Sequence, residues 1–550
     1  MLTSAPRFLT ACLLAATVMA PACALAAPLA ATVDAESAPA AAPAASPAAL
    51  NPAATTAACR SSSIAPSDLL ACYLAEQAAS PVAFNASGTT SIDGVVQHRY
   101  TMISQSWSPE HQVTPAIWKH RVDTYVPARP LKGHALLVIN DGINHGTAKD
   151  PAAAAGDFAP AVLATIARAS RTIVVSVSDT PNQYLTFSDD HKPRAEDDAI
   201  AHSWSLYLDG PASARASVAT STDTSASSSA AASVAGPDPQ ADARQYISLY
   251  VPMTQTVVKA MDLAQQVLKP WDVQGFVVTG VSKRGWDSWL TALVDPRVDA
   301  IVPFVMDMLN TRAALTHTAA AYGNNWPLAF EPYYAEGIDR QLGTPNFEKL
   351  MKLQDPMQYL DTASAPRLQI PKYVVNASGD DFFVPDNARL YFDQLPGMKA
   401  LRVAPNSSHD GILRYTQQSL TAFLGRFQTS TPLPTVQTDV AQTNGATTLQ
   451  AQFAEAPAGV KLWTALDRHA RDFRYACGIR YKAKPLTVNA NGLVQVSLRD
   501  PSVGWAASFI EATFSDGFVA TSRVYVYPDS RYPNAAPPSK APYCQTLPAR

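Results

Sequence analysis

The stretch GFVVTGVSKRGW, residues 275–286, decides the expected fold, because an apolar run ends there on a serine that is followed by a helical pattern. A serine at a tight strand-to-helix turn has its hydroxyl raised clear of the sheet, and the next backbone N–H can face a developing oxyanion. Gly280 and Gly285 allow the turn to be sharp. The common G-x-S-x-G pattern is altered here, because Arg284 stands where the second glycine is usual. The alternative is that Ser282 is only the N-cap of the helix.

A carboxylate loop and a histidine loop follow downstream, each directly after another apolar run. The order serine, acid, histidine, with each residue just past a strand, is the arrangement of an α/β-hydrolase. We therefore expect Ser282 to be the nucleophile and His409 to be the general base that takes its proton. The acid should hold the tautomer of the histidine and stabilise its charged form.

Three carboxylates compete for the role of the acid. The spacing D-x-x-V-P that starts at Asp381 resembles the acid loop of many hydrolases and favours Asp381. Its neighbour Asp380 is then expected to cap the turn. Asp307, after the preceding apolar run, is a weaker alternative that would otherwise be a loop cap or part of a pocket wall.

The early loop NDGINHG lies where hydrolases draw the second N–H of the oxyanion hole. We expect Gly142 or Ile143 to supply this N–H and Lys283 to supply the first. A plain glycine-containing turn is the alternative. Asn144 and His145 are candidate substrate contacts, and the other interpretation of His145 is a solvated loop residue.

The segment 318–361 is long and rich in aromatic residues, and it lies between two expected strands. A segment in that place would cover the serine as a cap and shape the pocket. We expect Trp326 and Tyr333 to contact substrate, and the alternative is that such aromatic residues form the core of the cap itself.

Two different patterns of apolar residues divide the rest of the chain. Short apolar runs separated by helical patterns over residues 61–428 predict a mostly parallel sheet in an α/β domain. Short alternating strands without helices, over residues 435–550, predict a β-sandwich. The expected fold is therefore an α/β-hydrolase-like domain with a helical cap, followed by a C-terminal β-sandwich.

The N-terminal residues predict export. Residues 1–26 place Arg7 before an apolar run and small residues, which is typical of a signal peptide, and the run is too short for a membrane anchor. We expect a periplasmic or extracellular protein with no stable membrane span after cleavage. Residues 27–60 and 210–242 are rich in Ala, Pro, Ser and Thr, so we expect a disordered spacer and a solvated surface insertion.

Four cysteines remain outside the leader, and an even number in an exported chain suggests disulfides. Three pairings are possible, and separation along the chain favours Cys59 with Cys72 and Cys477 with Cys544. Unpaired buried thiols are the alternative. No Cys-x-x-Cys pair occurs, so a structural zinc site is not expected.

Charge and motifs exclude several other classes of function. The 550 residues carry 42 basic and 45 acidic side chains, a net charge of −3, so no basic field exists to bind nucleic acid. No H-E-x-x-H, Walker or dinucleotide-binding glycine motif occurs, so we expect neither a metal nor an organic cofactor. The oligomeric state is left open.

Several stretches resemble the family of PhoPQ-activated pathogenicity-related proteins. They are LVINDGIN from Leu137, PNQYLTF from Pro181, RAEDDAIA from Arg194 and TGVSKRGWDSW from Thr279, and G-V-S-K-R-G is the most specific part. The resemblance implies an exported α/β-hydrolase-like protein, tied in some bacteria to virulence and to resistance against cationic antimicrobial peptides. Relatives in amoebae resemble secreted proliferation repressors. The family's name describes regulation and no reaction.

Three hypotheses follow from these residues. The first is an exported serine hydrolase that cleaves an ester or a peptide-type amide through Ser282, His409 and Asp381. The second is an inert hydrolase-shaped binding or signalling protein whose sandwich is the working surface. The third is a carbohydrate esterase, because glucuronoyl esterases have a similar G-x-S-R-x-G turn.

Overall fold

The computed structural model describes residues 59, 64–209, 245–443, 446–538, 541–548 and 550. The expected signal peptide at 1–26, the spacer at 27–60 except for Cys59, and the insertion at 210–242 lie outside the described residues. None of the described helices is both long and apolar enough to cross a membrane.

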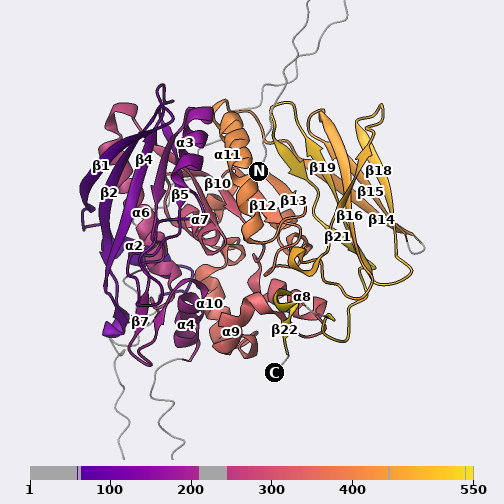
Figure 1. The fold of residues 1–550 in the computed structure, drawn as a ribbon, viewed down its shortest axis with the longest axis horizontal. Helices are drawn as coiled ribbons and strands as arrows, with labels where there is room; N and C mark the ends of the chain where they lie inside the picture. Colours follow the sequence, from indigo (N-terminus) through magenta and orange to yellow (C-terminus); the bar gives the residue numbers. More distant parts are fainter. Residues whose placement is uncertain (1–58, 60–63, 210–244, 444–445, 539–540, 549) are drawn as a thin grey trace, which may run out of the picture. The chain divides into compact units, whose positions relative to one another are not determined.

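A nine-stranded sheet forms the centre of the α/β part (Figure 1). The first three strands of this order pair antiparallel with one another and with the fourth, and the last six strands are parallel. The expected mostly parallel sheet of an α/β-hydrolase-like fold is therefore confirmed. The order across the sheet is β1(Ala83–Ile92), β2(Val95–Ser106), β4(Ile117–Val126), β6(Ile173–Val177), β5(His134–Ile139), β9(Gly275–Val281), β10(Val298–Phe304), β12(Lys372–Ala377) and β13(Lys399–Ala404).

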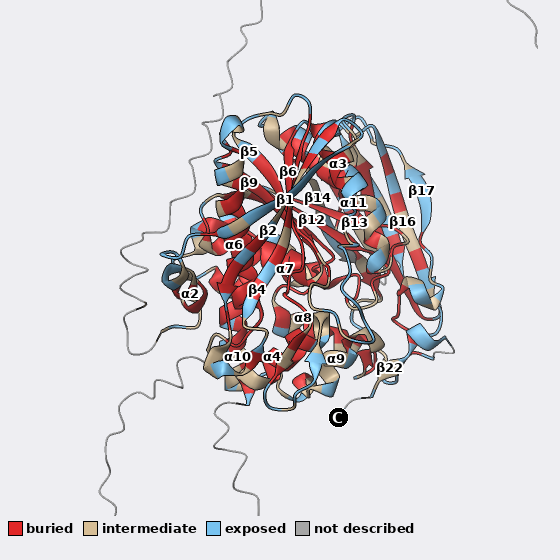
Figure 2. Cartoon of the chain, turned by 60° about the vertical axis from the view of Figure 1, so that its left-hand side comes forward, coloured by how far each residue is buried: buried red, intermediate tan, exposed pale blue. Residues whose placement is uncertain are grey.

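Helices cover both faces of this sheet, which explains why its strands are almost continuously apolar. On β5, Leu136 and Val138 pack on one face with α3(Pro160–Ser170) and α11(Leu413–Gln428). On the same strand, Leu137 packs on the other face with α6(Tyr250–Val267) and α7(Lys283–Val294). Figure 2 shows these central strands as almost entirely buried.

Short helices form a cap at one end of the α/β part (Figure 1). Thr344 starts one of them, because its hydroxyl accepts a hydrogen bond from the N–H of Phe347. At the start of another cap helix, the backbone N–H groups of Asn310 and Thr311 donate hydrogen bonds to the carboxylate of Asp355. The elements of the cap are α4(Glu196–Leu208), α8(Thr311–Ala321), β11(Trp326–Pro327), α9(Glu331–Ala335) and α10(Pro345–Gln354).

The C-terminal part is a β-sandwich, as the alternating pattern predicts. Leu449 and Ala451 of one antiparallel sheet pack against Val460, Leu462 and Ile510 of the other. The first sheet contains β14(Val436–Thr443), β15(Ala446–Phe453) and β18(Leu493–Arg499). The second contains β16(Gly459–Asp467), β17(Lys482–Leu486), β19(Trp505–Thr513), β20(Val519–Thr521) and β21(Tyr525–Tyr527).

The sandwich packs against the last strand of the central sheet. The backbone N–H of Val403 on β13 donates to the hydroxyl of Thr521 on β20, at 3.0 Å. Near this edge, the ring centroids of Tyr373 on β12 and Phe518 of the sandwich lie 4.4 Å apart. The two parts therefore share buried apolar surface along this edge.

Both favoured disulfides are present, so the predicted pairing is confirmed. Cys59 is bonded to Cys72, which lies on α2(Leu69–Gln77), and Cys477 is bonded to Cys544. Beyond Cys544 the chain forms β22(Thr546–Leu547), which pairs with β11 of the cap. The second disulfide therefore joins the sandwich to a C-terminal segment that lies on the cap.

Candidate active site

Ser282 lies at the turn between β9 and α7, in a backbone conformation that residues other than glycine rarely adopt. Its φ of 57° and ψ of −124° are strained for a residue other than glycine. A Cβ atom at Gly280 would lie 2.5 Å from the carbonyl oxygen of Arg284, and one at Gly285 would lie 3.0 Å from that of Gly280. Both glycines are therefore needed for the turn. Ser282 occupies the N-cap position of α7, but within the described chain its hydroxyl makes no capping hydrogen bond.

His409 is paired with Asp380 and not with Asp381, which the spacing favoured. The imidazole Nδ1 lies 3.0 and 2.9 Å from the two carboxylate oxygens of Asp380, and both side chains are buried. Asp380 also accepts hydrogen bonds from the backbone N–H groups of Phe382 and Phe383, at 2.8 and 3.2 Å. The expectation that it caps the turn was correct, but the same carboxylate faces the imidazole as well.

The other two carboxylates lie elsewhere. Asp381 accepts a hydrogen bond from the backbone N–H of His409, at 3.4 Å, instead of from the ring. Burial, reinforced by the charge of Asp380, raises the pKa of Asp381 to about 6. Asp307 is also buried, and its Oδ1 accepts a hydrogen bond from the hydroxyl of Tyr391 at 2.7 Å. Asp307, the weaker candidate for the acid, is therefore bound to Tyr391.

The pKa of His409 results from two opposing influences. Burial lowers the pKa, but the charge and the hydrogen bond of Asp380 more than offset it, so the pKa lies above its ordinary value. The positive charge of Lys283, the residue after Ser282, acts in the lowering direction. The serine loop and the histidine loop therefore lie within electrostatic reach of each other. In the part of the chain that the structure describes, no hydrogen bond joins Ser282 to His409.

Two backbone N–H groups were expected to form an oxyanion hole with a choice left open at the second position. The N–H of Lys283 lies in the first turn of α7, where a helix offers no acceptor of its own. The N–H of Ile143 is engaged, because it donates to the carbonyl oxygen of Ala153 at 3.1 Å. Ile143 is therefore wrong for this role, and Gly142 is the candidate that is left.

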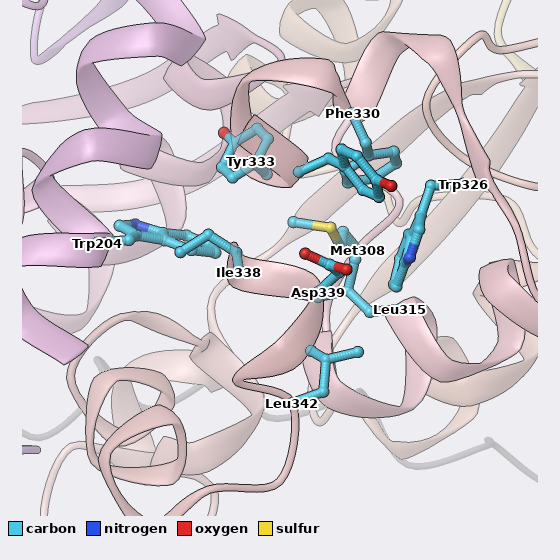
Figure 3. A pocket seen from close by; sticks show the side chains of 10 residues that line it. Trp204, Met308, Leu315, Trp326, Phe330, Tyr333, Ile338, Asp339 and Leu342 are labelled. Carbon is cyan, nitrogen blue, oxygen red and sulfur yellow. The ribbon is translucent and has the colours of Figure 1, made fainter. Parts of the chain in front are cut away.

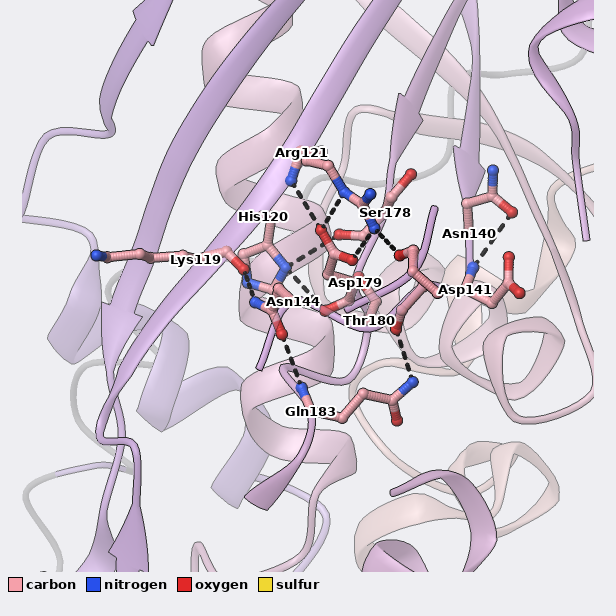
Figure 4. Close-up of polar contacts among 12 residues, drawn as sticks. Lys119, His120, Arg121, Asn140, Asp141, Asn144, Ser178, Asp179, Thr180 and Gln183 are labelled. Atoms are coloured by element: carbon pink, nitrogen blue, oxygen red, sulfur yellow. Dashed lines mark hydrogen bonds and ion pairs between the residues drawn. The ribbon is translucent and has the colours of Figure 1, made fainter. Parts of the chain in front are cut away.

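The side chain of Asn144 supports this loop through hydrogen bonds (Figure 4), and its contact with substrate stays a prediction. Its side-chain amide donates to Asn182 at 2.7 Å and accepts from the N–H of Gln183 at 3.1 Å. Gln183 in turn donates to the carbonyl oxygen of Gly142 at 2.7 Å. His145 is bonded through its backbone to Gln183 and Tyr184, while its buried Nε2 has no hydrogen-bond partner among the described residues.

A cluster of charged side chains for which no role was predicted lies under the serine turn. Lys283 pairs with Glu196 and Asp197 at 2.7 and 3.2 Å, and Arg284 pairs with Glu196 at 2.6 Å. Burial acts to raise the pKa of Glu196, but the two cations outweigh it and hold the pKa below its usual range. This explains Arg284 in place of a glycine, because its guanidinium also donates to the carbonyl oxygen of Thr180. The signals in the sequence were the acidic start of the helix at 196–198 and the resemblance of RAEDDAIA and G-V-S-K-R-G to the family.

Trp326 and Tyr333 line the same pocket under the cap (Figure 3). The pocket is small and partly open to solvent, and its exposed wall is almost entirely apolar. Both residues also contact Phe330 in the core of the cap. The same side chains therefore line a pocket and pack in the core of the cap, and their contact with substrate stays a prediction.

One group of described residues has the donor types of a metal site, Asp189, Asp190 and His202. These side chains already have partners. The imidazole of His202 contacts Asp189 at 3.1 Å and Glu336 at 2.9 Å, and Asp190 binds Arg194 through two hydrogen bonds. The group is accounted for by its own contacts.

Comparison with known proteins identifies relatives. A family model described as PhoPQ-activated pathogenicity-related protein matches residues 70–237 and 238–474. Autocrine proliferation repressor protein A of Dictyostelium discoideum is 29% identical over 440 residues, which are 75% of this chain and 79% of that protein.

The chain is also similar, at low identity, to solved structures. Acetyl xylan esterase from Paenibacillus sp. R4 is 12% identical with a TM-score of 0.38, covering 64% of this chain and 91% of its own. Glucuronoyl esterase from Solibacter usitatus is 13% identical with a TM-score of 0.34, covering 65% and 91%. Identities this low say nothing about substrate or reaction.

Proposed function

The chain belongs to the PhoPQ-activated pathogenicity-related protein family. We propose that it is a serine hydrolase that cleaves an ester or an amide bond. The observation that carries the proposal is the buried pair of His409 and Asp380, 2.9 Å apart, at the sheet edge where Ser282 occupies a strained strand-to-helix turn. A histidine oriented by a carboxylate and a serine raised on such a turn are the parts that acyl transfer requires.

The reaction would run through an acyl-enzyme. His409 takes the proton of the Ser282 hydroxyl through Nε2 as the oxygen attacks the substrate carbonyl carbon, and Asp380 stabilises the imidazolium. The backbone N–H groups of Lys283 and Gly142 stabilise the oxyanion of the tetrahedral intermediate. The intermediate collapses, and His409 gives its proton to the leaving alcohol or amine. Water then attacks the acyl group by the same steps, which releases the acid and restores Ser282.

The rival proposal is a hydrolase-shaped binding protein without catalysis. It is favoured by the lack of a hydrogen bond between Ser282 and His409 in the described structure. That observation is weak, because catalytic hydrogen bonds are often long before substrate binds. A carbohydrate ester is the third candidate, but the apolar wall of the pocket offers few groups for sugar hydroxyls.

We also propose that the protein acts outside the cytoplasm, in the periplasm or beyond it. The signal-like residues 1–26 and the two disulfides support this proposal, because disulfides persist in oxidising compartments. A connection with virulence rests on the family's description alone.

A substrate screen tests the reaction class. Purified protein is assayed against acetyl esters, glucuronoyl esters and peptidyl esters and amides, with the Ser282→Ala variant as the blank for each. Turnover that depends on Ser282 in any class supports a hydrolase, and the preferred class ranks the candidates. Equal rates for both proteins on every substrate would favour the binding protein.

A further inference from the structure

An ion pair packs against Gly142, the residue proposed to supply the second N–H of the oxyanion hole (Figure 4). Arg121, on β4, donates two side-chain hydrogen bonds to the carboxylate of Asp179, and the one from Nε is 2.8 Å long. A Cβ atom at Gly142 would lie 2.6 Å from Arg121 Nη2 and 2.6 Å from Asp179 Oδ1. The pair is therefore in direct contact with the backbone of Gly142 and leaves no room for a side chain there.

The backbone of Asp179 holds the peptide group that carries the Gly142 N–H. The N–H of Asp179 donates to the carbonyl oxygen of Asp141 at 2.9 Å. This carbonyl and the N–H of Gly142 belong to one planar trans peptide group, so they point in opposite directions. A hydrogen bond that fixes the carbonyl therefore also fixes the direction of the N–H. Within the described residues, the N–H of Gly142 donates to no acceptor, which leaves it available to an oxyanion.

The turn at residues 179–180 is also bonded to the serine loop. The carbonyl oxygen of Thr180 accepts a hydrogen bond from Arg284 Nε at 2.6 Å. Arg284 follows Lys283, whose N–H is the proposed first donor of the oxyanion hole. The turn thus contacts both segments that supply a donor, and its position sets the spacing between the two N–H groups.

Side chains of β4 hold Asp179 in this turn. Its φ of 65° lies in the left-handed region, which is unfavourable for a residue other than glycine. The carboxylate of Asp179 is fully buried against Arg121, whose Nη2 also donates to the carbonyl oxygen of Ala153 at 2.6 Å, across the oxyanion loop. Nδ1 of His120 lies 3.1 Å from the carbonyl oxygen of Asp179. Burial lowers the pKa of His120 to about 4, so a neutral ring donates this bond.

We propose that the ion pair of Arg121 and Asp179 positions the Gly142 N–H toward the oxyanion of the tetrahedral intermediate. This inference rests on the proposed function and adds two positioning residues to its site. The pair acts through the turn at 179–180 and through the peptide group between Asp141 and Gly142. Because a donor stabilises the oxyanion only when it is aimed at that oxygen, a displaced turn should slow the chemical step and leave substrate binding nearly unchanged.

Two matched esters test the oxyanion hole separately from proton transfer. The acyl group preferred in the substrate screen is supplied as its phenyl ester and as the phenyl thionoester, in which sulfur replaces the carbonyl oxygen, and release of phenol is followed. Sulfur is a weaker hydrogen-bond acceptor than oxygen, so the thionoester depends less on the two N–H groups. We expect Arg121→Lys and Asp179→Asn to lower kcat for the ester about 10- to 100-fold with little change in KM, and to lower kcat for the thionoester much less.

Control variants separate positioning from other effects. Arg99→Lys, the same change at an exposed position of β2, should leave both rates unchanged. Asp380→Asn should slow both esters by the same factor, because it acts on proton transfer. Circular dichroism checks folding, and the Arg121 side chain is 42% exposed, so Arg121→Lys should fold even if Asp179→Asn does not.

The ratio of the two ester rates decides the outcome. A lower ratio of ester to thionoester rate in folded Arg121→Lys supports the positioning role. Folded Arg121→Lys that slows both esters by the same factor, or slows neither, would overturn that role while the hydrolase proposal stands. Wild type without Ser282-dependent turnover of either ester would instead overturn the proposed function, and the positioning role with it.

Discussion

Tyr475, in the sandwich loop between β16 and β17, donates its backbone N–H to the carbonyl oxygen of Gly379, 2.9 Å away and one residue before Asp380. A Cβ atom at Gly379 would lie only 2.7 Å from that nitrogen, so the close approach requires glycine. The N–H of Gly379 in turn donates to Ser407, in the histidine loop, at 2.9 Å. The sandwich therefore braces both loops that carry the His409 and Asp380 pair.

Asn406 is a positioning residue in this brace. Its side chain donates to the carbonyl oxygen of Tyr481 at 2.9 Å and accepts from the N–H of Tyr481 at 2.7 Å. Asn406→Leu should lower kcat about 10- to 100-fold with little change in KM, because His409 would be misplaced while the pocket stays intact. Steady-state kinetics on the best ester measures this. Asn491→Ala, in an exposed turn of the sandwich, is the control, and an unchanged kcat in folded Asn406→Leu would contradict the brace.

Asp380 and Asp381 are adjacent, so matched variants separate their roles. Asp380→Asn should reduce kcat/KM by about 10³- to 10⁴-fold, because the imidazole loses the carboxylate that orients and stabilises it. Asp381→Asn should cost far less, since Asp381 accepts a hydrogen bond from the backbone N–H of His409 and not from its ring. Initial rates of ester hydrolysis at saturating and limiting substrate give both values. The reverse ranking would restore Asp381 as the acid.

The pH dependence of the reaction reports on His409. Its pKa lies above the ordinary value of about 6.5, and only the neutral imidazole accepts a proton. The rate should therefore rise with pH through a pKa above that value and be lost in acid. In Asp380→Asn, the carboxylate charge no longer offsets the lowering of the His409 pKa by burial, so the acidic limb of the rate profile should move to lower pH. A limb at the same pH in both proteins would show that His409 is not the group that titrates.

Glu196 stabilises the region under the serine turn. Glu196→Gln leaves Lys283 and Arg284 buried with fewer partners, and the free energy of unfolding should fall by about 1–3 kcal/mol. The carboxylate is partly exposed, at 38%, which keeps the expected loss below that of a fully buried pair. Because the folded pKa is depressed, this stabilisation is present at neutral pH and is lost as the pH falls below the ordinary range of glutamate. Urea denaturation of both proteins at pH 7 and pH 4 should show a smaller difference in acid.

Much of the fold and part of the site follow from local sequence patterns. Apolar runs with helices between them predict a sheet buried on both faces, and the glycines beside Ser282 predict the turn because their small size is needed there. The pairing of Cys59 with Cys72 follows from their proximity along the chain. These features depend on neighbours in sequence or on a periodic pattern.

The features that were missed depend on contacts between distant segments. Which of two adjacent carboxylates faces His409 is decided by the direction of the backbone in one loop, which spacing alone does not reveal. The N–H of Ile143 cannot serve the oxyanion hole because it donates to the carbonyl oxygen of Ala153, across the same loop. The bond from Tyr475 to Gly379 joins residues about a hundred positions apart, and neither residue carries a local signal for it.

Covalent labelling of Ser282 tests the central claim most directly. Purified protein is treated with a fluorophosphonate at several pH values, and the modified peptide is located by mass spectrometry, with Ser282→Ala and Asp380→Asn in parallel. The proposed mechanism predicts a single adduct on Ser282 in wild type, none at that position in Ser282→Ala, and strongly slowed labelling in Asp380→Asn. A folded wild-type protein that gains no adduct, or an adduct elsewhere that persists in Ser282→Ala, would contradict the assignment of Ser282 as a nucleophile.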